Sequence, residues 1–283
     1  MLRIAIQSKG RLNEDSTSLF QEIGISIDDA KRKFLSKSGN FPLEVLYMRD
    51  DDIPQVVAGG TAQLGIVGLN EVVERGADVK VEERLGFGGC RISLAIPKGE
   101  EYDGPAWFEG KRIATSYPNI LRKYLSDSGI DAKIEVITGS VEIAPAAGIA
   151  DAIFDIVSSG GTLVSNGLKE VEKVFFSEAV LISNGKLSEE DEALLEEIRF
   201  RIASVKVSRG MKYVLMNLPK ESIDEAIRIL PAMRSPTVMP LAAEGWCSLH
   251  SVVDEDSLWE KIRQLKAIGA EGILVLNVDK IIP

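Results

Sequence analysis

The chain of 283 residues contains one histidine, His250, and two cysteines, Cys90 and Cys247. A Ser-His-Asp triad or an HExxH zinc site needs a histidine beside its other catalytic residues. His250 falls in an expected strand near the C-terminus, where a packing or interface role is the simpler interpretation. The cysteines lie far apart and form no CxxC motif, so the sequence predicts neither a disulfide framework nor a structural zinc site.

Long apolar runs and an excess of basic residues are also missing. No segment has the length of apolar sequence that spans a bilayer, and the start, "MLRIAIQSKGRL", lacks the apolar region of a signal peptide. The net charge is -10, with lysine and arginine scattered along the chain. Nucleic-acid surfaces need clustered cations. We therefore expect a cytoplasmic protein that binds neither nucleic acid nor a membrane.

What is present is a globular composition, with 45% hydrophobic residues and a length suited to about two domains, or three small ones. The first part alternates apolar strands with helices, which is typical of a parallel sheet. The expected strands are 2–7, 43–48 and 64–69, and the helices that follow them are 16–23, 51–58 and 71–75.

A second α/β unit follows the apolar segment 90–97 and a polar loop. Segment 171–183 could return the chain to the first unit, and the acidic helix 188–198 has Leu194, Leu195 and Ile198 on one face. The strands expected in the second unit are 112–116, 133–138 and 151–157, and its helices are 118–126 and 141–147.

The last part has the order βαββαβ, the ferredoxin-like pattern. Its second helix has a capping box, Ser257 with Glu260, and Gly269 at its C-cap. The expected strands are 211–217, 236–241, 246–253 and 272–278, and the helices are 221–230 and 257–268.

The segment "DAIFDIVSSGGTLVSNGL", residues 151–168, changes from a buried strand to small, hydroxylated residues. Glycines allow close approach of backbone N–H groups to a ligand, and a following helix N-terminus adds positive potential, which suits a phosphate. An ordinary strand-to-helix turn has the same composition and remains an alternative. The candidate residues are Asp155, Ser158, Ser159, Gly160, Gly161 and Thr162.

Two further segments carry charge at strand ends. "QSKGRL" places Lys9 and Arg11 around Gly10 at the carboxyl end of a strand, where α/β sheets bind ligands. "RDDDIP" begins at Arg49, and its three aspartates, 50–52, would suit either a metal or the N-cap of a helix. An ion pair between Arg49 and these aspartates is the alternative to a binding role.

Taken together, these segments resemble the long form of the ATP phosphoribosyltransferase family over essentially the whole chain. The signature of the family corresponds to Glu142, Gly148, Ala150, Ile153, Asp155, Ile156, Ser159, Gly160, Thr162 and Leu163. Further matching segments are "SKGRL" (8–12), "LGIVG" (64–68), "GFGGCR" (86–91), "KRIATSYP" (111–118) and "SPTVMPL" (235–241). One departure is Gln63, where many members have aspartate.

The resemblance implies an α/β fold class with two periplasmic-binding-protein-like domains around a cleft and a C-terminal ferredoxin-like regulatory domain. It further implies transfer of the phosphoribosyl group of phosphoribosyl pyrophosphate to N1 of ATP, with Mg²⁺, as the first step of histidine biosynthesis. The domains implied are catalytic domain I, 1–90 and 178–205, catalytic domain II, 91–177, and the regulatory domain, 211–283.

The resemblance also assigns residues. Lys9, Arg11 and Arg49 would be catalytic, at the ATP side or at the pyrophosphate. ATP would contact Gly10, Arg11, Arg49 and Tyr117. Phosphoribosyl pyrophosphate would bind to Asp155, Ser158, Ser159, Gly160, Gly161 and Thr162. The metal ligands stay unassigned.

Regulation is expected in the last domain. Histidine would bind at Ser235, Thr237, Ala270 and Gly272, although these hydroxyl groups could merely cap a turn. AMP is a second expected inhibitor, and the family implies a homo-oligomer, dimer and hexamer. Two other classes fit parts of the sequence: a solute-binding protein without catalysis, and a ligand-sensing regulatory protein built on the βαββαβ module.

Overall fold

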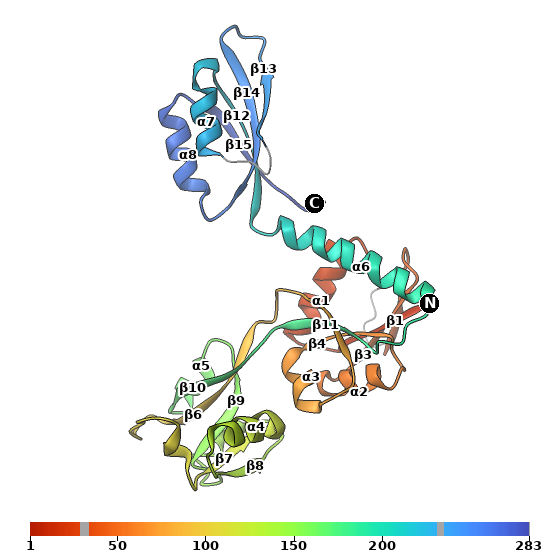
Figure 1. The fold of residues 1–283 in the computed structure, drawn as a ribbon, viewed down its shortest axis with the longest axis vertical. Coiled ribbons are helices and arrows are strands. Elements are labelled where there is room, and N and C mark those ends of the chain that lie inside the picture. The colour runs from red at the N-terminus through yellow and green to blue at the C-terminus, as the bar shows by residue number, and fades with distance from the viewer. Residues whose placement is uncertain (29–33, 231–234, 283) are drawn as a thin grey trace. The chain divides into compact units, whose positions relative to one another are not determined.

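The computed structural model describes residues 1–28, 34–230 and 235–282. The chain divides into two compact units, unit 1 from Met1 to Glu196 and unit 2 from Glu197 to Pro283 (Figure 1). Unit 1 contains a six-stranded and a five-stranded sheet, and unit 2 contains a four-stranded sheet.

The six-stranded sheet of unit 1, which we call lobe A, has the order β2-β3-β1-β4-β11-β5. Its centre is parallel, because β1 pairs with β3 and β4 in the same direction, whereas β2, β11 and β5 run antiparallel to their neighbours. The strands are β1 (Leu2–Gln7), β2 (Leu35–Lys37), β3 (Leu43–Met48), β4 (Leu64–Gly68), β5 (Lys80–Arg84) and β11 (Ala179–Ser183), and the helices are α1 (Arg11–Glu22), η1 (Asp50–Asp52), α2 (Ile53–Ala58) and α3 (Leu69–Arg75).

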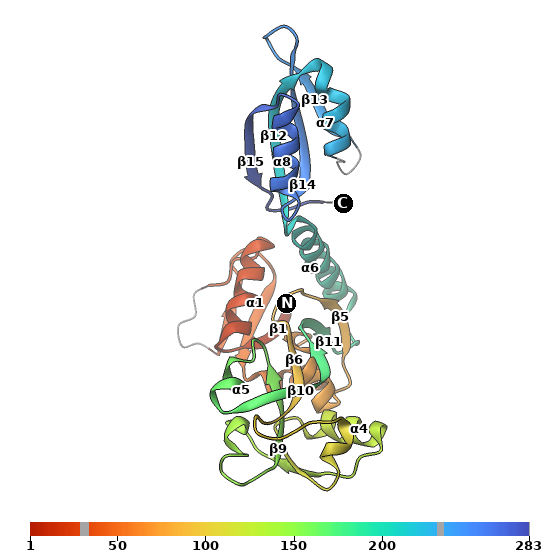
Figure 2. The ribbon, with the colours of Figure 1, turned by 90° about the vertical axis from the view of Figure 1, so that its left-hand side faces the viewer.

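The five-stranded sheet, lobe B, has the order β10-β6-β9-β7-β8. Its strands β6, β9 and β10 are labelled in Figure 2. Three of its strands, β9, β7 and β8, are parallel, and β6 and β10 are antiparallel to their neighbours. The elements are β6 (Cys90–Pro97), η2 (Pro105–Phe108), β7 (Arg112–Thr115), α4 (Pro118–Ser128), β8 (Lys133–Val136), η3 (Val141–Ile143), β9 (Ala152–Val157), α5 (Gly161–Ser165) and β10 (Leu168–Ser177).

The chain crosses twice between the lobes. It leaves lobe A after β5 and enters lobe B at β6, and it returns between β10 and β11, which are separated by residue 178 alone. The predicted return through 171–183 is therefore confirmed. Two α/β lobes joined by two crossing segments also agree with the predicted fold class, although the sheets are mixed and not purely parallel.

Three predicted helices differ from the structure by more than two residues at one end. α1 starts at Arg11, five residues before the predicted start. The predicted helix 141–147 is only the short turn η3, because Pro145 has no N–H group and disfavours helical geometry in the residue before it. α6 (Glu189–Ser208) continues ten residues beyond the predicted end at 198, since Ile202 and Val205 prolong the buried face of Leu195 and Ile198.

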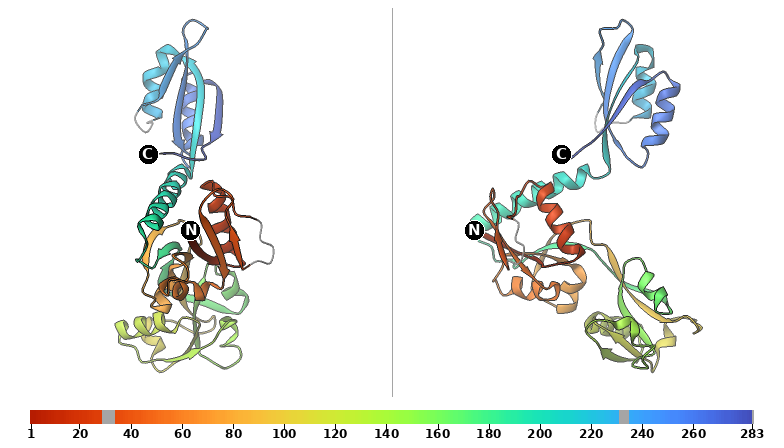
Figure 3. Two further views of the ribbon diagram at one scale, coloured as in Figure 1. Left: turned by 90° about the vertical axis from the view of Figure 1, so that its right-hand side faces the viewer. Right: turned by 180° about the vertical axis from the view of Figure 1, so that it is seen from behind.

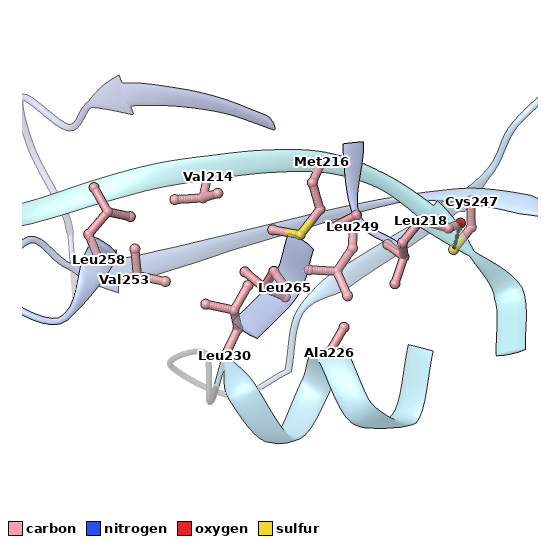
Figure 4. Packing of buried hydrophobic residues seen from close by; sticks show 11 residues of the cluster. Val214, Met216, Leu218, Ala226, Leu230, Cys247, Leu249, Val253, Leu258 and Leu265 are labelled. Atoms are coloured by element: carbon pink, nitrogen blue, oxygen red, sulfur yellow. Dashed lines mark hydrogen bonds between the residues drawn. The ribbon is translucent and has the colours of Figure 1, made fainter. Parts of the chain in front are cut away.

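Unit 2 has the predicted βαββαβ order, and its sheet order, β13-β14-β12-β15, is antiparallel throughout. Both helices, α7 and α8, cover the same face of this sheet (Figure 3). Apolar side chains of β12, β14 and the two helices form the core between these layers (Figure 4). The elements are β12 (Met211–Pro219), η4 (Lys220–Ser222), α7 (Ile223–Ile229), β13 (Thr237–Pro240), β14 (Trp246–Asp254), α8 (Leu258–Ala267) and β15 (Glu271–Asn277).

The predicted caps of α8 need correction. Ser257 is the N-cap residue, but its hydroxyl donates to the carbonyl of Asp254 and makes no capping bond to the helix. Ile268 is the C-cap, and Gly269 follows it with φ of 94°, a value that favours glycine. Among the described residues, no helix is both long and apolar enough to cross a membrane.

Candidate active site

A cavity of about 210 Å³ lies in unit 1, where strand ends of both lobes meet the crossing segments. Such strand ends are the usual ligand sites of α/β sheets. The cavity therefore joins segments that are widely separated in the sequence. Its lining residues are Gln7, Arg11, Leu12, Asp50, Gly68, Asn70, Glu71, Gly88, Gly89, Cys90, Ile156, Ser158 and Ala179.

The N-terminus of α1 forms one wall. Gly10 precedes the helix with φ of 90° and ψ of -177°, a conformation that favours glycine, and it supplies no side-chain cap. The N–H groups of the first turn and the helix dipole therefore favour an anion. Arg11, whose ligand-binding role stays a prediction, lines the cavity. Its side chain is 81% exposed and lies 3.9 Å from the carboxylate of Asp15. Lys9 and Gly10 lie in the same turn but are not part of the lining.

The small-residue loop after β9 forms part of the wall contributed by lobe B. Ser158 lines the cavity, and its carbonyl accepts a hydrogen bond from the Arg91 guanidinium at 3.2 Å. Gly160 precedes α5 with φ of 82°, which is again suited to glycine. Ser159, Gly161 and Thr162 are exposed. The predicted loop is thus an accessible row of small residues at the cavity, and its ligand remains a prediction.

Asp155 is half-buried in β9, next to this loop. One carboxylate oxygen accepts the N–H of Ile156 at 2.8 Å. Burial, with a smaller repulsion from Glu142, raises the pKa of Asp155 to about 6. A carboxyl group whose pKa is raised by burial beside a cavity is a candidate functional group.

In this structure Arg49 forms an ion pair with Asp51, which is the alternative to a binding role. Its guanidinium pairs with both oxygens of Asp51, at 3.0 and 3.2 Å, and Arg75 approaches the same carboxylate at 3.5 Å. Arg49 is not among the lining residues, whereas its neighbour Asp50 is. The side chain of Arg49 is 76% exposed, so the ion pair is a surface pair.

Tyr117 is connected to the cavity by Asn70 of α3, which lines the cavity and contacts the Tyr117 hydroxyl. Its hydroxyl accepts a hydrogen bond from the Asn70 amide at 3.4 Å, and Asn70 also donates to Glu71 at 2.9 Å. Burial raises the pKa of both Tyr117 and Glu71, and Asp50 adds a repulsion at Glu71. The sequence interpretation did not identify Asn70 or Glu71. The available signal was two polar residues that begin a short helix directly after a buried strand.

Cys90 is half-buried on the cavity wall, and burial raises the pKa of its thiol. Burial of this kind disfavours the thiolate form, which is the nucleophilic form of cysteine. The described residues contain no group of three or more histidine, cysteine, aspartate or glutamate side chains placed to hold a metal.

His250 lies in β14 of unit 2. Its Nδ1 contacts the Tyr213 hydroxyl at 2.8 Å, its Nε2 contacts the Ser248 hydroxyl at 3.1 Å, and the Tyr213 and His250 rings pack edge to face. These contacts fit the predicted packing role.

The four residues predicted to bind histidine do not all come together within one chain, although Ala270 and Gly272 line one cavity. Thr237 is on β13 and Gly272 is on β15, which are opposite edges of the four-stranded sheet with β14 and β12 between them. Ser235 lies two residues before β13, and Ala270 is buried in the core. One free amino acid cannot span two intervening strands, at about 4.8 Å per strand, so both edges of one sheet cannot contact the same molecule.

A cavity of about 390 Å³ lies at the β15 edge. Lys266 and Glu271 supply charges of both signs there. Its lining residues are Trp259, Ile262, Lys266, Ala270, Glu271, Gly272, Ile273 and Val275.

Two α/β lobes that share one cavity, together with a βαββαβ domain, define a two-lobed α/β protein with an appended small domain. Comparison with known families makes this specific. The ATP phosphoribosyltransferase family matches residues 49–204, and the family described as "HisG, C-terminal domain" matches residues 208–280. The chain belongs to the ATP phosphoribosyltransferase family.

Relatives agree over their full length. The chain is 61% identical to the ATP phosphoribosyltransferase of Phocaeicola vulgatus and 59% identical to that of Bacteroides thetaiotaomicron, in both cases over 282 residues and 100% of each chain. A solved ATP phosphoribosyl transferase (HisG:HisZ) complex from Thermotoga maritima is 28% identical, with a TM-score of 0.61, and covers 72% of this chain and 99% of its own. The predicted family, the transferase class and the link to histidine biosynthesis are thereby confirmed.

Proposed function

We propose that the unit 1 cavity binds ATP and phosphoribosyl pyrophosphate together and that the transfer takes place there. A bond forms between N1 of adenine and the anomeric carbon of the ribose, the bond from that carbon to pyrophosphate breaks, and pyrophosphate leaves with the bonding electrons. One observation carries the assignment: the start of α1 from lobe A and the Ser158 loop from lobe B line the same cavity.

On the lobe B side, the loop is proposed to hold the 5-phosphate and ribose of phosphoribosyl pyrophosphate. The loop offers donors that suit a phosphate. They are the hydroxyl groups of Ser158, Ser159 and Thr162 and the N–H groups of Gly160 and Gly161. Asp155 is mostly ionised above its pKa of about 6 and would accept hydrogen bonds from ribose hydroxyls. Support comes from the exposure of these donors beside the cavity.

On the lobe A side, ATP and the leaving pyrophosphate are proposed to contact Arg11, with Lys9 and Gly10 in the same turn. Arg49 would join them after exchanging Asp51 for a phosphate. That exchange is feasible, because an ion pair of an exposed arginine is screened by water and contributes little to stability. Tyr117 would then act at the nucleotide side through its position beside Glu71.

The chemistry needs orientation and charge stabilisation more than a protein nucleophile, since adenine N1 already carries a lone pair. A divalent cation, Mg²⁺, is proposed to accompany the substrates. Because the described residues offer no ready group of three ligands, the ion is proposed to arrive as a complex with the substrate phosphates. The carboxylates of Asp155 and Glu71 are the groups on the chain suited to face a developing oxocarbenium charge.

Unit 2 is proposed to bind histidine and so inhibit the reaction, with AMP as a second inhibitor. Since Thr237 and Gly272 lie on opposite sheet edges, the proposed site combines the β13 edge of one copy with the β15 edge of another. This requires a homo-oligomer, for which a dimer and a hexamer are the proposed states. A cytoplasmic location belongs to the same proposal.

The direct test is to mix the purified chain with ATP, phosphoribosyl pyrophosphate and Mg²⁺. Phosphoribosyl-ATP is followed by absorbance and pyrophosphate by a coupled assay, and reactions without each substrate are the controls. We expect both products in equal amounts. Pyrophosphate release that does not depend on ATP would point to hydrolysis instead, and no product under varied conditions would refute the function.

A further inference from the structure

The short helix α3 of lobe A buries three polar side chains, Asn70, Glu71 and Glu74, which are 4%, 5% and 3% exposed. A surface helix normally turns such residues to water. Asn70 and Glu71 line the cavity, but Glu74 is not part of the lining. Its burial therefore needs another explanation.

Glu74 caps a helix of the other lobe. Its carboxylate accepts the backbone N–H of Asn119, at 2.9 and 3.1 Å to the two oxygens, and that of Ile120 at 3.0 Å. These are N–H groups of the first turn of α4, which has no partner for them within that helix. Tyr117, the N-cap residue of α4, makes no side-chain capping bond. The Asn119 amide also donates to the Glu74 carbonyl at 2.9 Å, so the contact runs in both directions.

This contact is linked to the cavity through Tyr117. The residue lies immediately before α4, and its hydroxyl contacts Asn70. Asn70 is itself fixed to the crossing segment, because its N–H donates to the Ser177 hydroxyl at 3.0 Å and that hydroxyl donates back to the Asn70 side chain at 2.8 Å. One face of α3 thus connects the start of α4, the end of β10 and the cavity wall.

The contact tolerates little displacement. A carboxylate buried with hydrogen-bond partners is stable, but one whose partners move away is left as an unpaired buried charge. The positive end of α4 adds a favourable interaction that decays within the first turn. Glu74 therefore favours one separation and orientation of the two lobes.

We propose that Glu74 is a positioning residue for the transfer reaction: by capping α4 from the opposite lobe, it holds lobe B and Tyr117 where substrates bound to the two lobes meet in line. The proposal rests on the proposed function of the cavity. Small displacements of reacting groups reduce rates strongly, so the residue can matter without touching either substrate.

The test compares Glu74→Ala and Glu74→Gln with the control Glu44→Gln. Glu44 is a matched control, because it is also a buried glutamate but pairs with Arg3 and Lys37 inside lobe A. It lies at the start of β3, whereas the cavity lies at the strand ends. The measurements are kcat and KM for each substrate, thermal stability, and hydrogen exchange of the Asn119 and Ile120 amides.

We expect Glu74→Ala to lower kcat/KM for both substrates by roughly tenfold or more and to accelerate exchange at both amides. Glu74→Gln keeps an acceptor oxygen and should lose less. Glu44→Gln should lose stability but keep wild-type kinetics and exchange at these amides. If the alanine variant does not fold, the glutamine variant decides: lower kcat/KM in a folded protein supports the proposal.

Faster amide exchange with wild-type kinetics in a folded Glu74 variant would overturn the proposal. So would a loss of activity that only follows the fraction of folded protein, as in the control. If the wild-type chain itself forms no product, the proposed function fails, and the exchange data then show whether the contact between lobes exists in solution. The two failures are therefore distinguishable.

Discussion

We expect Asp155→Asn to have opposite effects on the stability of the fold and on catalysis at the proposed site. The substitution keeps the size of the side chain and an oxygen that can accept the Ile156 N–H, but it removes the charge. Burial raises the pKa of Asp155 to about 6 from an ordinary value of 3.8. The folded protein thus holds the proton more tightly than the unfolded chain does.

The sign of the pH effect follows from this shift. The contribution of Asp155 to stability is fully present below pH 3.8 and is lost as the pH rises through about 6. Two pKa units correspond to about 3 kcal/mol, and partial exposure of the side chain reduces this to about 1–3 kcal/mol. Asp155→Asn should therefore be more stable than wild type by about 1–3 kcal/mol at pH 8, with the difference falling toward zero below pH 4.

The same substitution should impair catalysis. Loss of a charged acceptor for ribose hydroxyls is worth about 1.5–3 kcal/mol, or a roughly ten- to hundredfold lower kcat/KM for phosphoribosyl pyrophosphate. The measurements are urea unfolding at several pH values and steady-state kinetics. Asp151→Asn is the matched control, because hydrogen bonds from Arg112 lower the pKa of Asp151. It should be destabilised at neutral pH, with a difference that shrinks in acid, and keep its kinetics.

Two results would refute the reasoning about Asp155. If Asp155→Asn is less stable than wild type at pH 8, or if the difference does not depend on pH, the folded protein does not pay a desolvation penalty at this carboxylate. If its kinetics equal those of wild type while the stability changes as expected, Asp155 is buried but does not contact the substrate.

Three further substitutions test the remaining assignments. Arg11→Ala should impair the use of ATP with little effect on unfolding, and an easily unfolded variant whose folded fraction is fully active would make Arg11 structural. Thr162→Val removes one hydroxyl donor at nearly constant volume and should weaken the use of phosphoribosyl pyrophosphate by roughly ten- to hundredfold, while ATP affinity stays the same; unchanged kinetics for both substrates would remove Thr162 from the site. Thr237→Ala should leave uninhibited turnover near normal and weaken the response to histidine, as measured by titration; an unchanged curve would place the effector elsewhere.

Most of the fold was predictable because its central strands are apolar and its helices amphipathic. Two strands at the edges of their sheet, β2 and β5, were not predicted at all, whereas β6, β10 and β11 fall largely in the segments 90–97 and 171–183, for which no strand was specified. The sequence of β5, "KVEER", has four charged residues and little apolar alternation, so only its pairing with β11 makes it a strand. The later end of α6 was available in the sequence, since Leu195, Ile198, Ile202 and Val205 keep helical spacing.

Residues of the candidate site were predictable where a single short segment of the sequence contains the motif. Arg11 and Ser158 were assigned from short motifs, and both line the cavity. Asn70 and Glu74 were not, because their partners Ser177 and Asn119 are 107 and 45 residues away in the sequence. From the sequence alone, polar residues on a short helix are interpreted as a solvent-exposed face. Only the folded structure shows that the second lobe covers them.

The charge of the cavity constrains how polyanions can bind. Within the described part of the chain, Arg11 is the one cationic side chain on its wall, whereas Asp50 and Glu71 are acidic and the whole chain carries -10. Clustered cations would attract phosphates over a long range and lose much of that attraction in salt. If the cavity is the proposed transfer site, the attraction would come from fixed N–H groups at α1 and the loop before α5, together with phosphates partly neutralised by the proposed divalent cation. On this proposal, such short-range donors would select a correctly placed phosphate, and Asp50 and Glu71 would disfavour polyanions that arrive without the cation.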